Sequence, residues 1–477
     1  MAAASLAGQA IGFIALMVVS RRIGPDNLGA FSFATSLCRF FAIPVNFGIS
    51  TLAIREIARR PSDATRIAGQ VLALRLGLFL VSYAALVALA PVIASDALVQ
   101  TLLPICGLFV LGDVVGLAWG LQGLQRFVAV ALISLGGQVV YGALVPLLVD
   151  GGPHGAVVYA WLNVVGAMAA AVGSWIWFVR KAGWPALPRS LRSLGRLWLS
   201  AAPIGLSFVM IFVYYSLDSV MLGYLRSTYE VGQYGVGYRL VAAIIGFAGL
   251  WVTVLFPHAA RLYKLDPVRL GRQIRSAVTL GTVVALPIGV GGSLVATPLM
   301  IGLFGAAFAN AGAPFAVLIW SAVVVIVSVN FGNVLMACDG ERVFAKGVAL
   351  GALVNIVLNF ALIPFWGAIG AAISTVVTEI LVMALMAVAL RRRVPVAAPD
   401  VRRLGGALAA TTIMAGVVIA LLQVTNIWVT VAAGGTIYAA VVLMLRVVRP
   451  GDLGRLRREG TVNGGAATSS NADHDRE

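Results

Sequence analysis

Fourteen apolar runs follow one another along the chain, each close to the roughly 20 residues that an α-helix needs to cross a bilayer. Charged residues make up only 11% of the 477 residues, whereas a soluble protein carries about 25%. The chain is therefore predicted to be an all-α polytopic membrane protein with about 14 transmembrane helices. A soluble enzyme, a disulfide scaffold and a disordered protein are excluded. The runs cover residues 2–20, 30–53, 67–93, 98–120, 127–148, 155–179, 197–224, 232–256, 276–304, 312–337, 344–364, 367–390, 404–424 and 427–447.

Lysine and arginine gather in one alternate set of loops. Of the 34 basic residues, three lie in the opposite loops and three lie inside apolar runs. The first three are Arg21, Arg22 and Arg226, and the second three are Arg39, Arg75 and Arg239. Cytoplasmic loops carry the excess of basic residues, so this bias predicts that both termini are cytoplasmic. The net charge of +16 then reflects membrane topology, and no nucleic-acid partner is expected.

A long basic segment divides the chain into six spans before it and eight after it. Gly29-Ala-Phe31 opens the second span and Gly232-Gln-Tyr234 opens the eighth, which indicates a weak internal repeat. Two six-helix lobes of the same orientation form a parallel pseudo-repeat, a common transporter plan. We expect an N-terminal lobe at 1–180, a cytoplasmic linker at 181–196, a C-terminal lobe at 197–391, two appended spans at 392–450 and a disordered cytoplasmic tail at 451–477.

Six charged residues lie inside the predicted spans, where a charge is costly unless it faces a cavity or a partner. They are Arg39, Arg75, Asp113, Asp218, Arg239 and Glu379. Arg39 and Arg239 lie in the outer halves of their helices, which favours a water-filled cavity, although a structural ion pair is the alternative. Arg75 can also reach the cytoplasmic interface with its long side chain.

The three acidic residues each leave two interpretations open. Glu379 lies near the middle of its run, where it is either a proton or cation site or the buried partner of an arginine. Asp113 and Asp218 each line the cavity or hold an arginine. Asparagines 330, 333, 355 and 359 form a polar stripe over two successive spans, and such amides more often bond neighbouring helices than bind substrate.

Motifs of enzymes and metal sites are absent from the sequence. It holds no P-loop lysine motif, no Gly-x-Ser-x-Gly elbow and no His/Cys metal cluster. Cys38, Cys106 and Cys338 lie far apart in apolar runs and are interpreted as small core residues. We therefore expect no enzymatic activity, no metal and no cofactor. A membrane glycosyltransferase is also disfavoured, because the loops are short and mostly basic.

Four segments together resemble bacterial polysaccharide (O-antigen) flippases, in the order expected for that family and over nearly the whole chain. Residues 20–31 (SRRIGPDNLGAF) resemble the first outer loop, and residues 119–127 (WGLQGLQRF) resemble a motif after the fourth span. Residues 218–225 and 230–240 resemble the seventh and eighth spans. The most specific match covers residues 355–359 (NIVLN) and 363–375 (IPFWGAIGAAIST).

This family belongs to one superfamily with multidrug exporters and lipid II flippases. The resemblance implies two lobes around a central cavity that opens alternately to each side of the bacterial cell membrane. The implied cargo is a polyprenyl-diphosphate-linked glycan, which moves from the cytoplasmic to the outer leaflet for polysaccharide biosynthesis. Glycosyltransferases or a polymerase of the same pathway are the implied partners. A multidrug or cation antiporter of the same fold and a lipid II flippase are the alternatives.

On this resemblance, Arg39 and Arg239 are expected to contact the diphosphate or an acidic sugar, because a desolvated diphosphate needs charge-assisted hydrogen bonds. Asp218 and Arg75 are assigned to the same substrate cavity. Glu379 and Asp113 are assigned to ion coupling.

Overall fold

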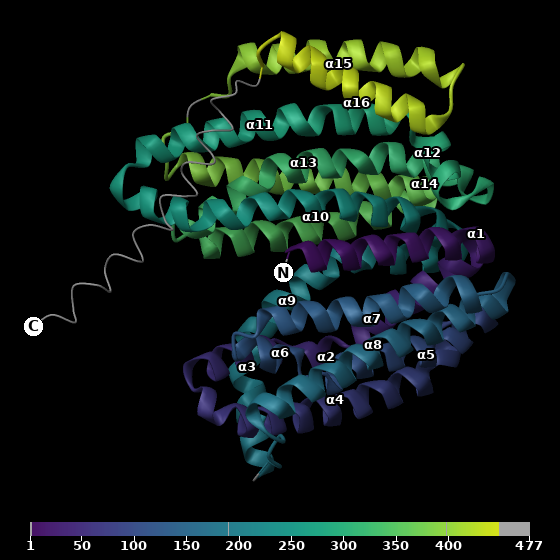
Figure 1. Cartoon of the computed structure of the whole chain (residues 1–477), viewed down its shortest axis with the longest axis vertical. Coiled ribbons are helices and arrows are strands. Elements are labelled where there is room, and N and C mark those ends of the chain that lie inside the picture. The colour runs from purple at the N-terminus through teal and green to yellow at the C-terminus, as the bar shows by residue number, and fades with distance from the viewer. Residues whose placement is uncertain (1, 189, 397, 448–477) are drawn as a thin grey trace, which may run out of the picture. The chain divides into compact units, whose positions relative to one another are not determined.

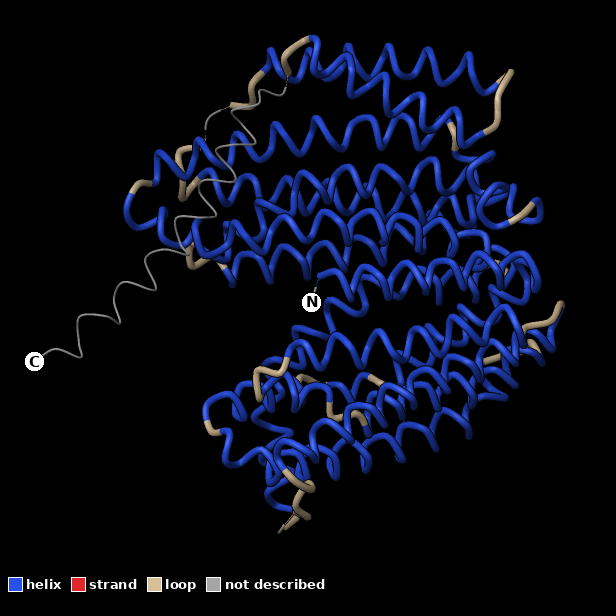
Figure 2. Tube along the Cα trace, viewed as in Figure 1, coloured by secondary structure: helices blue, strands red, loops and turns tan. Residues whose placement is uncertain are grey.

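The computed structural model describes residues 2–447 apart from 189 and 397, and its long helices follow the apolar runs (Figure 1). The described residues contain helices, turns and loops but no strand (Figure 2). The predicted all-α fold is thereby confirmed. The tail 451–477, for which disorder is expected, lies outside the described residues.

In the first half of the chain the helices run in the order in which the spans were predicted. They are α1 (Ala2–Phe41), α2 (Ile43–Asn46), α3 (Ile49–Arg59), α4 (Ala64–Ile93), α5 (Ala97–Val115), α6 (Ala118–Gly123), α7 (Phe127–Leu148) and α8 (Gly152–Ala182), with the 3₁₀ turn η1 (Pro61–Asp63) before α4.

The second half continues with the remaining helices. They are α9 (Leu191–Leu225), α10 (Thr228–Leu265), α11 (Pro267–Leu294), α12 (Ala296–Phe304), the 3₁₀ helix η2 (Ala306–Ala311), α13 (Gly312–Ala337), α14 (Glu341–Arg391), α15 (Val401–Leu422) and α16 (Ile427–Met444).

The count of membrane-spanning helices needs one adjustment. Among the described residues, 10 helices are long and apolar enough to cross a membrane, against the roughly 14 spans predicted. Two of them join predicted spans: α1 contains the first predicted span and the beginning of the second, on either side of Gly24 (φ +76°), and α14 contains two spans, which meet at Gly367 (φ +52°). Glycine adopts a positive φ without steric penalty, so two helices meet there without an intervening loop. The seventh and eighth spans coincide with α9 and α10, which are described only in part.

Three predicted spans are interrupted. The run 30–53 ends as a helix at Phe41 and is followed by the short α2, by Gly48 (φ +69°) and by α3. The run 98–120 breaks at Gly116 between α5 and α6, and the run 276–304 breaks at Val295 between α11 and α12. A side chain at Gly48 would lie 2.8 Å from the backbone nitrogen of Gly205, so α9 packs directly on the first break.

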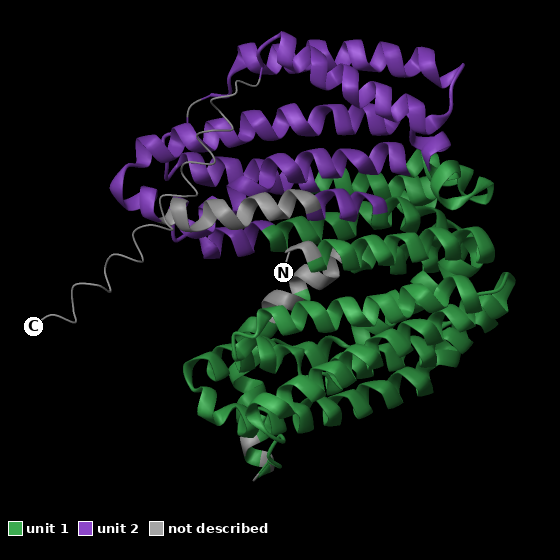
Figure 3. Cartoon of the chain, in the orientation of Figure 1, with its two compact units in different colours: residues 1–239, 300–314, 348–378 green, residues 240–299, 315–347, 379–477 purple. Residues whose placement is uncertain are grey.

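Contacts along the chain define two compact units (Figure 3). Unit 1 contains residues 1–239, 300–314 and 348–378, and unit 2 contains residues 240–299, 315–347 and 379–477. The predicted lobes at 1–180 and 197–391 are a different division and stay a prediction. In unit 1, Ile57, Trp119 and Phe178 belong to one buried cluster that joins α3, α6 and α8. In the same unit, α1, α5, α7 and α8 pack against one another and enclose the space described next.

Candidate functional site: a cationic cavity

A cavity of about 390 Å³ lies among α1, α5, α7 and α8 and reaches Arg239 of α10. This volume falls in the range of sites that bind small molecules, about 300–1,000 Å³. Arg39 enters the cavity from the last turn of α1. Among the described residues that line it, these two arginines are the only charged ones, and no aspartate or glutamate joins them.

The two arginines line the same cavity, so their like charges repel each other. Arg39 is exposed, while Arg239 is half-buried. Two like charges that line one cavity are costly, because they repel each other and no carboxylate among the described lining residues compensates them. An anion bound between them removes this cost. The cavity therefore has the electrostatics of an anion site.

Uncharged polar and aromatic groups complete the lining. The hydroxyls of Tyr141 and Tyr159 are hydrogen-bonded at 2.9 Å, and the ring of Phe31 meets that of Tyr159 edge-on with centroids 4.6 Å apart. Gln138 and Asn163 add amides to the same surface. Amides and hydroxyls both donate and accept hydrogen bonds, and aromatic faces contact apolar surface. These groups can surround a neutral, hydroxyl-rich molecule next to the anion.

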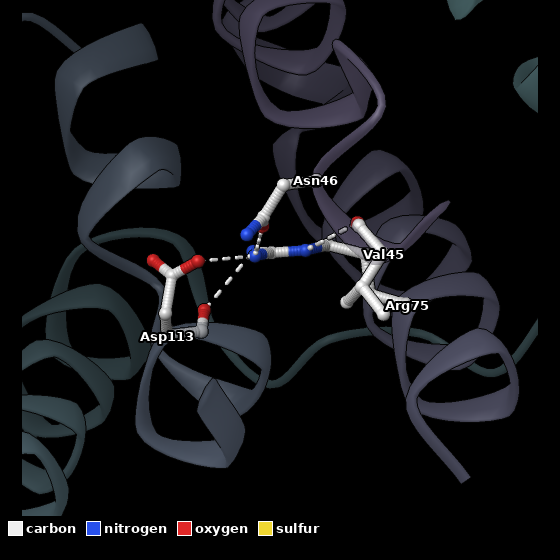
Figure 4. A network of polar contacts seen from close by, with 4 residues as sticks. All are labelled: Val45, Asn46, Arg75 and Asp113. Carbon is white, nitrogen blue, oxygen red and sulfur yellow. Dashed lines mark hydrogen bonds and ion pairs between the residues drawn. The ribbon is translucent and has the colours of Figure 1, made fainter. Parts of the chain in front are cut away.

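Arg75 on α4 occupies a different place, outside the described lining of the cavity (Figure 4). Its side chain is fully buried, at 0% exposure. It donates to Val45 O at 3.3 Å and to the side-chain oxygen of Asn46 at 2.5 Å. It also donates to both Asp113 O at 3.0 Å and the Asp113 carboxylate at 2.5 Å.

This arrangement explains how two interrupted helices are held. Val45 lies in the last turn of α2, and Asp113 lies in the last turn of α5. Carbonyls in a last turn have no intrahelical partner, and a cation is favourable at a helix C-terminus. One guanidinium thus caps both breaks. The ion pair between Arg75 and Asp113 is the structural alternative that the sequence left open for these two residues.

Asp218 on α9 forms a second buried polar cluster with α10 and α14. Asn359 donates to one carboxylate oxygen at 2.5 Å, while Thr375 and Tyr234 donate to the other at 3.0 and 3.1 Å. Asn359 also donates to the side-chain oxygen of Asn355 at 3.0 Å, so part of the asparagine stripe belongs to this cluster. Among the described residues every partner of Asp218 is uncharged. The side-chain oxygen of Asn359 is buried without a hydrogen-bond partner.

The structure thus brings together Arg39 with Arg239, and Arg75 with Asp113. It places Asp218 with uncharged partners on three helices. Glu379 is buried on α14, with 8% of the residue exposed, and is engaged in an interaction with another residue.

Sequence reasoning did not single out Tyr234 and Glu230. Tyr234 is fully buried against Asp218. Glu230 accepts a hydrogen bond from the backbone of Ala368 at 2.7 Å, just after the kink in α14, and forms an ion pair with Arg226 at 2.9 Å. Both residues lie in a segment that resembles the flippase family, and this resemblance was the available signal.

The comparisons with known proteins agree with this architecture. Two solved structures are similar over most of the chain, at 12% and 15% sequence identity. The lipid II flippase MurJ in an inward closed conformation has a TM-score of 0.76 and covers 93% of this chain and 98% of its own. An inward-facing multidrug resistance transporter of the MATE family has a TM-score of 0.64 and covers 80% and 95%. At these identities the likeness shows the fold alone, the two-lobed helical fold that the resemblance implied.

Sequence relatives extend the comparison. The probable flippase AglR of Haloferax volcanii is 30% identical over 240 residues, which are 48% of this chain and 50% of the relative. The chain therefore matches about half the length of that protein. The putative O-antigen transporter of Shigella dysenteriae is 21% identical over 78% of this chain and 94% of the relative. Residues 1–263 match the family model described as polysaccharide biosynthesis protein. Since this match covers more than half of the 477 residues, the protein belongs to the polysaccharide biosynthesis protein family.

Proposed function

We propose that the protein is a flippase for a polyprenyl-diphosphate-linked oligosaccharide used in polysaccharide biosynthesis. The observation that carries the proposal is the cavity that Arg39 and Arg239 both line without a described carboxylate. A diphosphate that leaves water needs charge-assisted donors, and each such hydrogen bond contributes about 1.5–3 kcal/mol. The relatives named flippase and O-antigen transporter support the same cargo class.

We assign each kind of lining residue to one part of the cargo. Arg39 and Arg239 bind the diphosphate, since a planar guanidinium matches the geometry of phosphate oxygens. Gln138, Asn163 and the hydrogen-bonded tyrosine pair meet the hydroxyls of the first sugar. The polyprenyl chain is as apolar as the bilayer and stays in it.

The direction of transport follows from the distribution of basic residues. We place the basic loops and both termini in the cytoplasm, because Arg21, Arg22 and Arg226 are the only basic residues in the opposite loops. A cargo assembled on the cytoplasmic side then enters between the arginines and leaves toward the outer leaflet.

The coupling ion is best assigned to the Asp218 cluster. Asp113 and Glu379 are engaged in other interactions, whereas the described partners of Asp218 are neutral. A buried carboxylate with neutral donors takes up a proton or a monovalent cation without breaking an ion pair. We expect Asp218→Asn to abolish transport but to leave diphosphate binding intact. Transport that continues at the normal rate in this variant would remove Asp218 from the coupling role.

Two other functions share the fold. A multidrug antiporter for cationic drugs requires carboxylates in its cavity, and this lining has two arginines instead. A lipid II flippase carries a diphosphate as well, so the cavity does not separate it from the proposed function. Viability of a strain that lacks the gene, together with loss of its surface polysaccharide, favours polysaccharide export over cell-wall synthesis.

Complementation of such a strain tests the proposal. Arg39→Ala and Arg239→Ala are each expected to abolish surface polysaccharide and to accumulate the lipid-linked precursor, while the protein stays in the membrane. Arg39→Lys retains a charge and should restore part of the polymer. Lys264→Ala, which removes an exposed basic residue at the end of α10, is the matched control and should behave as wild type. Normal polymer from both arginine-to-alanine variants would reject the assigned cargo site.

A further inference from the structure

The C-terminus of α12 is capped by an arginine that lies almost 300 positions earlier in the chain. The last turn of α12 leaves the carbonyls of Gly302, Leu303 and Phe304 without intrahelical partners. Arg21 donates to Leu303 O at 3.1 Å and also to Gly302 O. The Ser20 hydroxyl donates to Met17 O at 3.0 Å and lies 3.5 Å from Phe304 O. All of these residues belong to unit 1. The first predicted lobe therefore closes a helix end of the second.

Backbone packing continues this contact between the same two parts of the chain. A Cβ atom on Gly29 would lie 1.7 Å from Thr228 O, and one on Gly232 would lie 2.0 Å from Pro25 O. Real Cβ atoms do not approach so closely, so α1 and α10 touch here through glycine backbones. Gly29 opens the second predicted span and Gly232 opens the eighth, which are the two positions whose likeness indicated the repeat. The contact is thus a junction between equivalent positions of the two predicted lobes.

The junction lies directly beside the cavity. Phe31 lines the cavity only two residues after Gly29, and Thr35 lines it one helical turn further. Ser20 and Arg21 precede the kink at Gly24 on the same helix. Any opening of the cavity toward this end of the bundle must therefore separate Gly29 from Gly232 and release the end of α12.

We propose that Arg21 is the latch of the outer gate, a positioning residue that keeps the cavity closed toward the outside by capping α12. This inference rests on the proposed transport function and on the proposed orientation. A guanidinium is suited to the task because it binds two carbonyls at the negative end of the helix dipole. Both bonds must break when the cavity opens outward.

The neighbouring arginine provides a matched control within the molecule. Arg22 is exposed like Arg21 and also caps a helix end, donating to Pro146 O at 2.9 Å and to Val149 O at 2.7 Å. These carbonyls belong to the end of α7, inside the first predicted lobe. Removal of Arg22 also deletes a positive charge and a helix cap, but it removes no contact with α12.

Access to the cavity from outside tests the latch. Ser134 is exposed and lines the cavity, so Ser134→Cys supplies a reporter once Cys38, Cys106 and Cys338 are replaced by alanine. A membrane-impermeant maleimide is added to intact cells. In this background Arg21→Ala should raise the labelling rate about tenfold, the population shift expected when hydrogen bonds from a charged donor are lost. Arg21→Lys should fall between the two, and Arg22→Ala should leave the rate unchanged.

Two results overturn the latch. One is unchanged labelling in Arg21→Ala, and the other is an equal increase in Arg22→Ala. Membrane level and a single symmetric elution peak in detergent verify that each variant is folded. Labelling needs no glycan, so it is independent of the cargo. If Arg21→Ala increases labelling while Arg39→Ala and Arg239→Ala make normal polymer, the role of Arg21 in the gate is supported and the proposed cargo is rejected.

Discussion

Two aspartates in the apolar helices are stabilised in opposite ways by their surroundings. Asp113 binds the fully buried Arg75, yet 65% of its own side chain is exposed. Asp218 is buried, with 4% of the residue exposed, and is held by neutral donors alone among the described residues. Asp113 provides the counter-charge for a guanidinium group that is buried away from water. Asp218 is itself a buried charge and needs hydrogen-bond donors to compensate it. These roles predict different responses to mutation.

The pair of Arg75 and Asp113 should respond asymmetrically. Arg75→Leu leaves the helix-end carbonyls of Val45 and Asp113 without their donor, and we expect it to lower the free energy of unfolding by about 1–3 kcal/mol for each carbonyl. Asp113→Asn keeps the backbone carbonyl and an acceptor oxygen but removes the negative charge that contacts the buried guanidinium, and should cost about 1.5–3 kcal/mol, the range for a hydrogen bond to a charged group. Thermal unfolding of both purified variants in detergent measures the difference. Equal losses of stability would contradict the view that Arg75 is a cap for two helix ends.

The Asp218 cluster is tested by removal of one hydroxyl. Tyr234→Phe deletes the donor that lies 3.1 Å from the carboxylate and should cost about 1.5–3 kcal/mol, the range for a hydrogen bond to a charged group. Tyr229→Phe is the control on the same helix, because its hydroxyl only accepts an exposed bond from Asn310. That change should stay within about 0.5 kcal/mol. Similar unfolding temperatures for the two variants would mean that Tyr234 does not stabilise the carboxylate.

At the scale of helices, the kink in α14 depends on a glycine and on two charged side chains. Gly367 has φ +52° and ψ −130°, and a Cβ atom there would lie 1.9 Å from a carboxylate oxygen of Glu230. Arg226 donates to Pro364 O before the kink, and Glu230 accepts from the backbone of Ala368 after it. The pair therefore satisfies backbone groups on both sides of the break, as a helix interruption in a membrane requires.

Gly367→Ala is expected to be destabilising by about 1–3 kcal/mol, because alanine is strained at φ +52° and the Glu230 carboxylate must move away from the backbone of Ala368. Gly416 in α15 gives the contrast, since nothing lies within 4 Å of its Cβ position. Gly416→Ala should be neutral or stabilise the helix by up to about 1 kcal/mol. Expression level and unfolding temperature of the two variants measure this difference. A well-folded Gly367→Ala protein would show that the kink tolerates other backbone angles.

Some features of the helices could be predicted from the sequence, and others could not. Apolar length locates helices because the bilayer leaves little choice, and the helices accordingly follow the apolar runs. The breaks within 30–53 and 98–120 were missed, because the residue that stabilises them is Arg75 on a third helix. Arg39 and Arg239 were singled out because charges are rare in such runs, but their shared cavity depends on tertiary packing. Glu230 was missed because it lies beside a loop, where charged residues are ordinary.

For the whole molecule, two arginines in one cavity predict selective binding of a diphosphate to the purified protein. A ligand that binds only the folded state stabilises it by about 2.7 kcal/mol at a concentration of 100 times Kd. A short-chain isoprenyl diphosphate should therefore raise the unfolding temperature. The monophosphate should do so less, because it offers fewer oxygens to the two guanidinium groups, and sodium sulfate at equal ionic strength controls for screening.

Arg39→Ala and Arg239→Ala should each lose most of the shift, whereas Arg75→Lys should retain it, because Arg75 lies outside the described cavity lining. A cationic drug that stabilises the wild type more than the diphosphate does would favour the antiporter instead.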